Sequence, residues 1–355
     1  MNSANIANIA NIAIDAAGGE YAPHEIVKGA VKAAQDYNVN ITLVGRKDIL
    51  YVQASRYLKK LEMTIVDASQ VIEDNESPIE AVQSKPDSSI AVGINLVRTG
   101  EASAFVSAGN TGAVLYSALA DLGRIEGIER PAIGSIISVN TAAPVLLIDA
   151  GANANCRPGH LVQFAHLGAI YTREVLGIQS PRIALLSNGA EESKGNRLTR
   201  ETHSLLKESN LNFVGNVEGH GIVRGIADVI VTDGFTGNIV LKTLEALGDT
   251  FLKLRNVGQV FAGSQRMESR HQVFDTGLGS LIKRIDYRES GGACLLGVNG
   301  DVIIAHGRSQ AKAIRNAIGL AKQSVDRNVC QIIREYSTAD STRRTESAED
   351  GEEAG

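Results

Sequence analysis

The sequence contains two turns whose residues are suited to binding an anion. "SAGNTGAV" (107–114) follows the apolar run Ala104–Val106, and "TDGFTGNI" (232–239) follows Val229–Val231. A turn that leaves a buried strand and opens a helix presents unpaired backbone N–H groups at the positive end of the helix dipole, where phosphate can bind. Glycine allows close approach to such a ligand, and threonine can cap the helix. For a single turn, the geometric need for Gly and Thr would be the simpler explanation.

Two further turns have the same setting. "DAAGGE" (15–20) and "DAGANANCRPGH" (149–160) also follow apolar runs. Four such turns at strand ends favour a ligand over a purely geometric need. Neither G-x-G-x-x-G nor G-x-x-x-x-G-K-S/T occurs, so the fingerprints of dinucleotide and P-loop sites are absent. The residues alone therefore predict an α/β protein that binds a phosphorylated or anionic ligand.

The elements that must position these turns alternate along the chain. Apolar runs predict strands at 9–14, 40–45, 63–68, 102–109, 144–153, 182–189, 212–219 and 227–234, and helical spacing predicts helices at 23–34, 77–84, 111–123, 160–175, 197–208 and 237–252. Strands of this kind, separated by helices, indicate a three-layer α/β fold with a mostly parallel sheet and helices on both faces. Ligands of such folds bind at the C-terminal ends of the strands. We expect one large domain over residues 1–336.

Two segments interrupt this alternation. Residues 253–288 mix apolar side chains with many Lys and Arg residues and form a basic, amphipathic insertion. Residues 337–355 are acidic and have no apolar periodicity, which predicts a disordered tail.

Composition excludes several classes of protein. The chain has 355 residues, a net charge of -5 and only 4% aromatic residues, which argues against binding to nucleic acid. The three cysteines form no C-x-x-C motif, so we expect reduced thiols in the cytoplasm and neither a metal site nor a disulfide framework. The N-terminus lacks the charge pattern of a signal peptide, and no apolar run approaches about 18 residues, so a soluble protein is expected.

Longer strings resemble one known family. They are "SAGNTGAVLYSALADLGRIEGIERPA" (107–132), "DAGAN" (149–153), "PGHLVQFA" (158–165), "KGN" (194–196), "GNVEG" (215–219), "ADVIVTDGFTGNIVLKTLE" (227–245), "GGACLLG" (291–297) and "AHG" (305–307). Together they resemble the bacterial phosphate acyltransferase family known as PlsX, over about Ile9 to Gln331. The resemblance implies a fold similar to that of phosphate acetyltransferases and of isocitrate and isopropylmalate dehydrogenases.

The resemblance also implies an activity and partners. A homodimeric enzyme of this family moves a fatty acyl group from acyl carrier protein to inorganic phosphate, and the acyl phosphate enters phospholipid synthesis. It needs no cofactor. It associates peripherally with the membrane surface, where a membrane glycerol-3-phosphate acyltransferase uses the product. The insertion 253–288 would contact anionic lipids, dock acyl carrier protein or simply cover the dimer as a solvated helix pair.

The reacting groups follow from the match. Catalytic roles are implied for Lys194, Asp233, Asn238 and His306, and substrate binding for Asp15, Gly18, Gly19, Asn110, Thr111, Gly112, Asn153, His160, Thr236 and Gly237. The two Gly-x-Thr-Gly turns would supply donors to phosphate and to the carbonyl oxygen, and we expect both to border one crevice. Helix capping is an open alternative for the Asn residues, Asp233 and His160. A solvated loop lysine and a buried histidine are the alternatives for Lys194 and His306.

The chain also departs from the family pattern. The departures lie at Ala17, Glu20, Asn155, Ser187, His220, Gly221 and Ile304. They leave three hypotheses open: an acyl carrier protein:phosphate acyltransferase, a phosphotransacylase that uses acyl-coenzyme A, and a weakly active homologue that scaffolds lipid enzymes. Cys156 and Cys294 receive no catalytic role.

Overall fold

The protein folds as two compact units. A computed structural model describes residues 9–138, 144–262 and 291–339. Unit 1 comprises residues 1–127 and 291–355, and unit 2 comprises residues 128–290. The expectation of one large domain over residues 1–336 stays a prediction beside this division into units. The basic insertion lies largely outside the described residues; only its start, 253–262, is seen, as helical backbone.

Unit 1 is built on a mostly parallel sheet. Its strands lie in the order β3 (Met63–Asp67), β2 (Asn40–Gly45), β1 (Asn11–Asp15), β4 (Ala104–Ser107), β11 (Asp301–Ile304) and β10 (Ala293–Leu296). Strand β10 runs antiparallel to β11, and the other pairs are parallel. Strands β10 and β11 are not predicted from the sequence; β10 is an apolar run of four residues, and β11 has three apolar residues after the charged Asp301.

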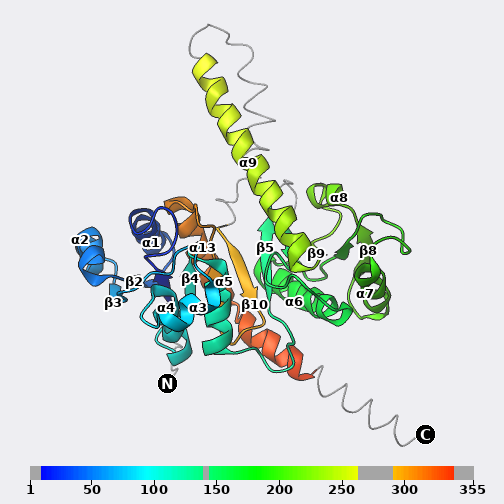
Figure 1. Cartoon of the computed structure of the whole chain (residues 1–355), viewed down its shortest axis with the longest axis horizontal. Coiled ribbons are helices and arrows are strands. Elements are labelled where there is room, and N and C mark those ends of the chain that lie inside the picture. The colour runs from blue at the N-terminus through cyan, green and yellow to red at the C-terminus, as the bar shows by residue number, and fades with distance from the viewer. Residues whose placement is uncertain (1–8, 139–143, 263–290, 340–355) are drawn as a thin grey trace, which may run out of the picture. The chain divides into compact units, whose positions relative to one another are not determined.

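Helices cover both faces of this sheet (Figure 1). They are α1 (His24–Asp36), α2 (Lys47–Leu58), α3 (Pro78–Ser84), α4 (Ser89–Thr99), α5 (Thr111–Ser117), the π-helical η1 (Ala118–Leu122) and α13 (Ala311–Asp326). Helices α1 and α13 pack together, so closely that a Cβ at Gly29 would lie 2.6 Å from Ile314 Cβ. Helix α4 packs on β1 and β4, and Phe105 fills the space above Gly93.

The chain of unit 1 ends in a further helical stretch at residues 329–339. It extends three residues into the segment that the sequence assigns to a disordered tail. Ser337 is buried there, and its hydroxyl donates to the carbonyl oxygen of Glu126. The described helix therefore runs past the predicted boundary at residue 337, where the sequence shows no apolar periodicity. Residues 340–355 lie outside the described chain.

Unit 2 has the same architecture. Its strands lie in the order β5 (Ala132–Ile137), β6 (Val145–Ile148), β9 (Val229–Val231), β7 (Ile183–Leu186) and β8 (Phe213–Val217), and its helices are α6 (Pro158–Leu176), α7 (Arg197–Glu208), α8 (Gly219–Arg224) and α9 (Gly234–Ala262). Strand β5, which is not predicted from the sequence, is antiparallel to β6. The predicted fold class, a mostly parallel sheet with helices on both faces, is confirmed.

Alternation along β6 divides the core of unit 2 between two helices. A Cβ at Gly168 of α6 would lie 3.2 Å from Ile148 and 3.6 Å from Leu146. Leu147, between them, belongs to the opposite cluster, against which Val240 and Leu241 of α9 pack. The rest of α9 extends beyond the sheet of this unit (Figure 1). Among the described helices, none has the length and apolar character needed to cross a membrane.

Candidate functional site

In unit 1, three strand ends bring predicted site residues together. Strand β4 lies between β1 and β11, and all three are parallel, with Ile14 opposite Val106 and Ser107 opposite Ile304. The loops that follow Asp15, Ser107 and Ile304 therefore leave the sheet at the same edge. These loops carry the predicted residues of "DAAGG", "AGNTG" and "AHG".

Asp15 anchors this edge as a buried carboxylate. Its Oδ1 accepts the backbone N–H groups of Ala17 (3.1 Å) and Gly18 (2.9 Å), and its Oδ2 accepts the hydroxyl of Ser107 (2.7 Å). Burial raises the pKa of Asp15, and the hydrogen bonds, led by those from the Ser89 and Ser107 hydroxyls, oppose that rise. The two carboxylate oxygens of Asp15 bind the loop that follows β1 and the end of the neighbouring strand β4. Asp15 therefore connects these two segments, and its carboxylate is not exposed to a ligand.

The predicted glycines bring the three loops into contact. A Cβ at Gly18 would lie 2.2 Å from Asp15 Oδ2 and 2.8 Å from the backbone nitrogen of Gly109. Gly19 has a φ of +99°, which disfavours any side chain. The next backbone N–H, of Glu20, donates to the carbonyl oxygen of Gly307 at 2.8 Å. Glycine at positions 18 and 19 thus allows the three loops to pack closely together.

The first Gly-x-Thr-Gly turn is capped by its asparagine. Asn110 Oδ1 accepts the N–H of Ala113 (3.0 Å), and Nδ2 donates to the carbonyl oxygen of Glu73 (3.2 Å). The side chain of Asn110 is buried, and Gly112 packs on Pro78, 2.6 Å from a would-be Cβ. Thr111 is exposed at the first position of α5. Within this turn, Thr111 is the side chain that a ligand can meet directly.

His306 lies half-buried after β11. The backbone N–H of Arg308 donates to its Nδ1 at 3.1 Å. Because Nδ1 accepts, the neutral ring carries its proton on Nε2, where it is a donor. This tautomer is the one that could donate to an oxyanion or to a departing thiolate.

Unit 2 repeats the buried carboxylate at the end of β6. Asp149 Oδ1 accepts N–H groups from Ile133 (3.0 Å), Gly151 (3.1 Å) and Ala152 (2.9 Å), and Oδ2 accepts the backbone and side-chain N–H groups of Asn153 (2.8 and 2.9 Å). Burial raises the pKa of Asp149, and these hydrogen bonds oppose the rise. The loop 149–153 is therefore folded around this side chain.

The second turn packs directly on Asp149. Strand β9 is parallel to β6, with Ile148 opposite Val231, so the loops after both strands meet. A Cβ at Gly237 would lie 1.9 Å from the carbonyl oxygen of Asp149, and a Cβ at Gly234 would lie 2.7 Å from its Oδ2. Only glycine fits at either position.

Asp233 caps the helix that follows. Its Oδ1 accepts the backbone N–H of Thr236 (2.9 Å) and its Oδ2 accepts the hydroxyl of Thr236 (2.8 Å). Within the described chain, no hydrogen bond or ion pair links Asp233 to Lys194. The capping alternative therefore describes Asp233, and the Thr236 hydroxyl is engaged with it.

Asn153 and His160 also have structural partners. Asn153 Nδ2 donates to Pro131 at 2.7 Å as well as to Asp149. His160 Nδ1 accepts the N–H of Arg157 (3.1 Å) at the start of α6, and Nε2 lies 3.1 Å from Glu129 Oε2. Both side chains are buried. The structure thus shows the capping role for His160 and a loop-bracing role for Asn153.

Two predicted residues of unit 2 are exposed. Lys194 lies in the loop between β7 and α7, with its stem over Gly189, and makes no ion pair among the described residues. Asn238 is exposed on the first turn of α9, where its side chain lies 3.6 Å from a would-be Cβ of Gly151. These two side chains are oriented by packing and remain accessible to a ligand.

The cysteines do not form a nucleophile. Burial, assisted by the charge of Asp149, raises the pKa of Cys156 to about 11, and burial raises the pKa of Cys294 well above its usual range. Both are therefore thiols at neutral pH. No group of three or more His, Cys, Asp or Glu residues within the described ranges has the geometry of a metal site.

The predicted site residues thus form two clusters, one in each unit. Asp15, Gly18, Gly19, Asn110–Gly112 and His306 lie at one edge of unit 1; Asn153, Thr236, Gly237 and Asn238 lie at one edge of unit 2. The expectation that the two turns border one crevice stays a prediction. Sequence reasoning assigns no role to Ser107 or Asp149. The repeated "DA" after an apolar run, at 15–16 and 149–150, is the signal that would have found Asp149.

Comparison with known proteins identifies the class. A family model described as "Fatty acid synthesis protein" matches residues 10–332. A phosphate acyltransferase of Dehalococcoides mccartyi is 55% identical over 96% of this chain and 97% of its own length. One of Thermoanaerobacterium thermosaccharolyticum is 45% identical over 91% of this chain and 95% of its own length. The α/β fold with its paired strand-end turns is therefore that of an acyltransferase.

The chain belongs to this fatty acid synthesis protein family, the phosphate acyltransferase family that the motifs resemble. Solved structures agree on the fold. A phosphotransacetylase from Streptococcus pyogenes has a TM-score of 0.59 at 17% identity and covers 90% of this chain and 95% of its own. A branched-chain phosphotransacylase from Enterococcus faecalis V583 has a TM-score of 0.55 at 15% identity and covers 89% and 99%.

Proposed function

We propose that this protein transfers a fatty acyl group from acyl carrier protein to inorganic phosphate and so forms acyl phosphate for phospholipid synthesis. The observation that carries the proposal is the similarity to phosphate acyltransferases over nearly the whole chain, at 55% identity to one of them. The two sets of strand-end donors support it, because they suit a reaction whose nucleophile is an anion.

The chemistry needs no covalent enzyme intermediate. A phosphate oxygen attacks the thioester carbonyl carbon, the carbonyl oxygen becomes an oxyanion, and the C–S bond breaks with the electron pair leaving on sulfur. A thiol has a pKa of about 8.5, so the thiolate leaves with little help from an acid. Catalysis then depends on holding the reactants together and on stabilising the oxyanion.

We assign these tasks to the accessible groups. Lys194 balances the charge of phosphate, and the backbone N–H groups of the two turns, with Thr111 and Asn238, donate to phosphate and to the carbonyl oxygen. His306 is assigned as the general acid, and its Nε2–H donates to the departing sulfur. Asp15 and Asp149 act as positioning residues, since their carboxylates are occupied by their own loops.

We further propose that acyl carrier protein and the membrane surface are partners of a homodimer. The basic character of 253–288 supports contact with an acidic protein or with anionic lipid. A cytoplasmic enzyme with peripheral attachment would release its product where a membrane glycerol-3-phosphate acyltransferase uses it.

The decisive test measures acyl phosphate, trapped as the hydroxamate, from purified protein, phosphate and either acyl carrier protein or coenzyme A thioesters. Product from the carrier protein thioester is expected. Absence of product from both donors would overturn the proposed activity, and product from coenzyme A thioesters alone would overturn the proposed donor.

Lys194→Ala tests the assignment of the phosphate-binding cation. We expect kcat/KM to fall by about 10²-fold, the effect of removing one charged donor from the reacting centre. Lys207→Ala is the matched control, because Lys207 is also exposed in unit 2 but is paired with Glu192 at 2.9 Å. Full activity of Lys194→Ala would remove Lys194 from the site.

A further inference from the structure

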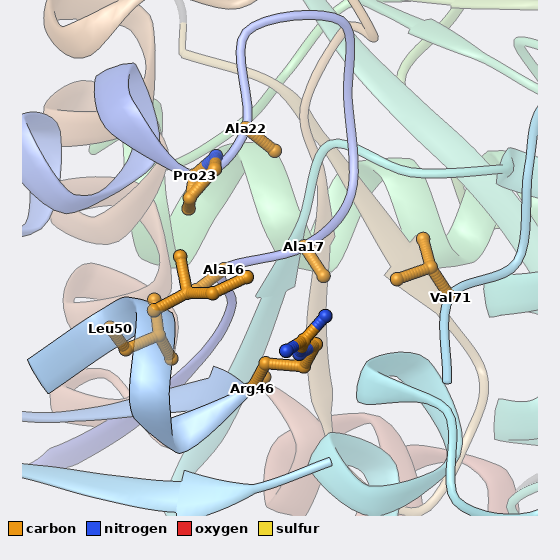
Figure 2. A pocket seen from close by; sticks show the side chains of 9 residues that line it. Ala16, Ala17, Ala22, Pro23, Arg46, Leu50 and Val71 are labelled. Atoms are coloured by element: carbon orange, nitrogen blue, oxygen red, sulfur yellow. The ribbon is translucent and has the colours of Figure 1, made fainter. Parts of the chain in front are cut away.

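An apolar pocket lies beside the unit 1 cluster, at the C-terminal ends of β1 and β2 (Figure 2). Its volume is about 150 Å³. Aliphatic side chains form its walls: Leu50 and Ile49 come from α2, and Val71 lies on the opposite side of the view, beyond Ala17. None of the residues discussed so far as reacting groups lines it.

The pocket exists because the residues between these walls are small. Ala16, Ala17, Ala22 and Gly45 occupy the floor and rim. A Cβ placed on Gly45 would lie 3.4 Å from Leu50 Cδ1 and 3.8 Å from the Cβ atoms of Ala16 and Ala17, at ordinary contact distances within the cavity. These small residues therefore leave the volume between the walls open.

The pocket and the unit 1 cluster share two segments. Ala16 and Ala17 directly follow Asp15, and the N–H of Ala17 binds its carboxylate. Val71 begins the segment whose Glu73 carbonyl oxygen accepts Asn110 Nδ2, and Lys85 Nζ fixes it by donating to Val71 at 2.7 Å. A molecule bound at the first turn therefore has the pocket as its neighbour.

The chemistry of the lining selects an apolar ligand. Arg46 is the one charged side chain of the lining, and its guanidinium is paired with Asp48 at 2.7 Å. A phosphate or a polar base would find no other side-chain hydrogen-bonding group there. At about 30 Å³ for a water-sized group, the volume holds about five methylene groups.

We propose that this pocket binds the methyl end of the acyl chain of the donor thioester. This assignment rests on the proposed function, because it takes the acyl group of that reaction as its ligand. Arg46 lies at one side of the pocket with its guanidinium directed toward Ala17 (Figure 2), and the pairing with Asp48 and the 55% exposure of its side chain offset its charge beside the chain. The pocket then contributes to selection of acyl-chain length.

Acyl-chain profiles of two filling variants test the pocket. Ile49→Trp fills it from α2 and Val71→Trp fills it from the other wall; Val52→Trp, on α2 at 80% exposure and outside the lining, is the matched control. In the unmodified protein and the control, kcat/KM should rise about fourfold for each methylene group that the pocket removes from water. In both filling variants the profile should flatten at long chains, with kcat/KM for the shortest acyl donors unchanged.

Binding measured without catalysis separates this proposal from the proposed function. Decanoate, added to each protein without phosphate or thioester, should bind the unmodified protein and Val52→Trp at least tenfold more tightly than the filling variants. Equal decanoate affinity and an unchanged profile would overturn the pocket assignment while leaving the activity intact. Absence of acyl phosphate from every donor would instead overturn the function, and the decanoate result would still decide the pocket.

Selective loss of adenosine 3′,5′-bisphosphate binding in the filling variants, with decanoate binding unchanged, would also overturn the proposal. It would assign the pocket to a nucleotide. Circular dichroism of each variant verifies folding. The same result for Ile49→Trp and Val71→Trp, which lie on opposite walls, excludes an effect of one misfolded variant.

Discussion

The two units hold their Gly-x-Thr-Gly turns in the same way but with different donors. In each, a buried aspartate ends one parallel strand and the turn follows the neighbouring strand: Asp15 with β4, Asp149 with β9. Asp15 accepts hydroxyl groups as well as backbone N–H groups. Asp149 accepts N–H groups alone. A hydroxyl can rotate and also accept, whereas an N–H group can only donate.

The turns also differ in what they present to solvent. In unit 1 the asparagine caps the helix and is buried, while in unit 2 an aspartate caps the helix and Asn238 is exposed one turn later. The asparagine of the first turn thus stabilises its own turn, whereas the asparagine of the second turn is accessible to a ligand. Substitutions at the equivalent positions of the two units measure these differences.

The largest effect is expected from Gly237→Ala. Its new Cβ would lie 1.9 Å from the backbone oxygen of Asp149, which cannot move without opening the loop, so the cost should exceed the roughly 1–3 kcal/mol of ordinary overpacking. Gly109→Ala, whose Cβ would lie 3.1 Å from Asp15 Oδ2, should stay within that range. Urea midpoints measured by circular dichroism compare the two, and equal midpoints would contradict the tighter packing in unit 2.

Asp149→Asn should destabilise the protein by about 4 kcal/mol. The new amide would face the two N–H groups of Asn153 that Oδ2 now accepts, and each unsatisfied buried donor costs about 1–3 kcal/mol. Asp15→Asn should cost below about 1 kcal/mol, because its amide can donate to the Ser107 oxygen. Asp48→Asn, at an exposed site, is the control. Similar unfolding free energies for the Asp15 and Asp149 variants would disprove the distinction between hydroxyl and N–H donors.

A substitution at Asp301 tests whether hydrogen-bond donors or burial decide how a buried carboxyl group affects the free energy of unfolding. Ser324 donates to it, and burial raises its pKa to about 6. Because the folded pKa exceeds the unfolded value of about 3.9, the stability contribution is complete below about pH 4 and is lost as pH rises through 6. Asp301→Asn should thus be more stable than the unmodified protein by about 1 kcal/mol at about pH 4.5 and about 3 kcal/mol at about pH 7.5. Urea unfolding across this pH range measures the difference, and a pH-independent difference would refute it.

The sequence predicts the parallel core of each unit well, because buried parallel strands are continuous apolar runs between helices. Strand 40–45 has the predicted bounds, and both turns follow the predicted strands. The antiparallel strands β5 and β10 are not predicted, since Gly134 and Ser135 interrupt the apolar residues of β5 and neither strand is followed directly by a helical pattern.

The sequence predicts only part of the candidate site. Gly-x-Thr-Gly spacing shows where donors lie, but it does not show which side chains the fold itself uses. Asn110, Asn153 and His160 look alike as polar residues after strands. The side chains of Asn110 and Asn153 donate to backbone oxygens far away in sequence, those of Glu73 and Pro131. His160 binds the nearby N–H of Arg157 and the distant side chain of Glu129. Those partners depend on the tertiary structure.

The smallest effect separates the two asparagines. Asn110→Ala removes the cap of α5 and should lower stability by about 1 kcal/mol. Asn238→Ala should leave stability unchanged, since no hydrogen bond of its side chain occurs among the described residues, but should lower kcat/KM about tenfold, or about 1.4 kcal/mol. Thermal unfolding and initial rates on the same preparations give both numbers. If Asn238→Ala lost stability and kept its rate, the accessible amide of unit 2 would be a brace like that of unit 1, and the reacting donors would have to be the backbone N–H groups alone.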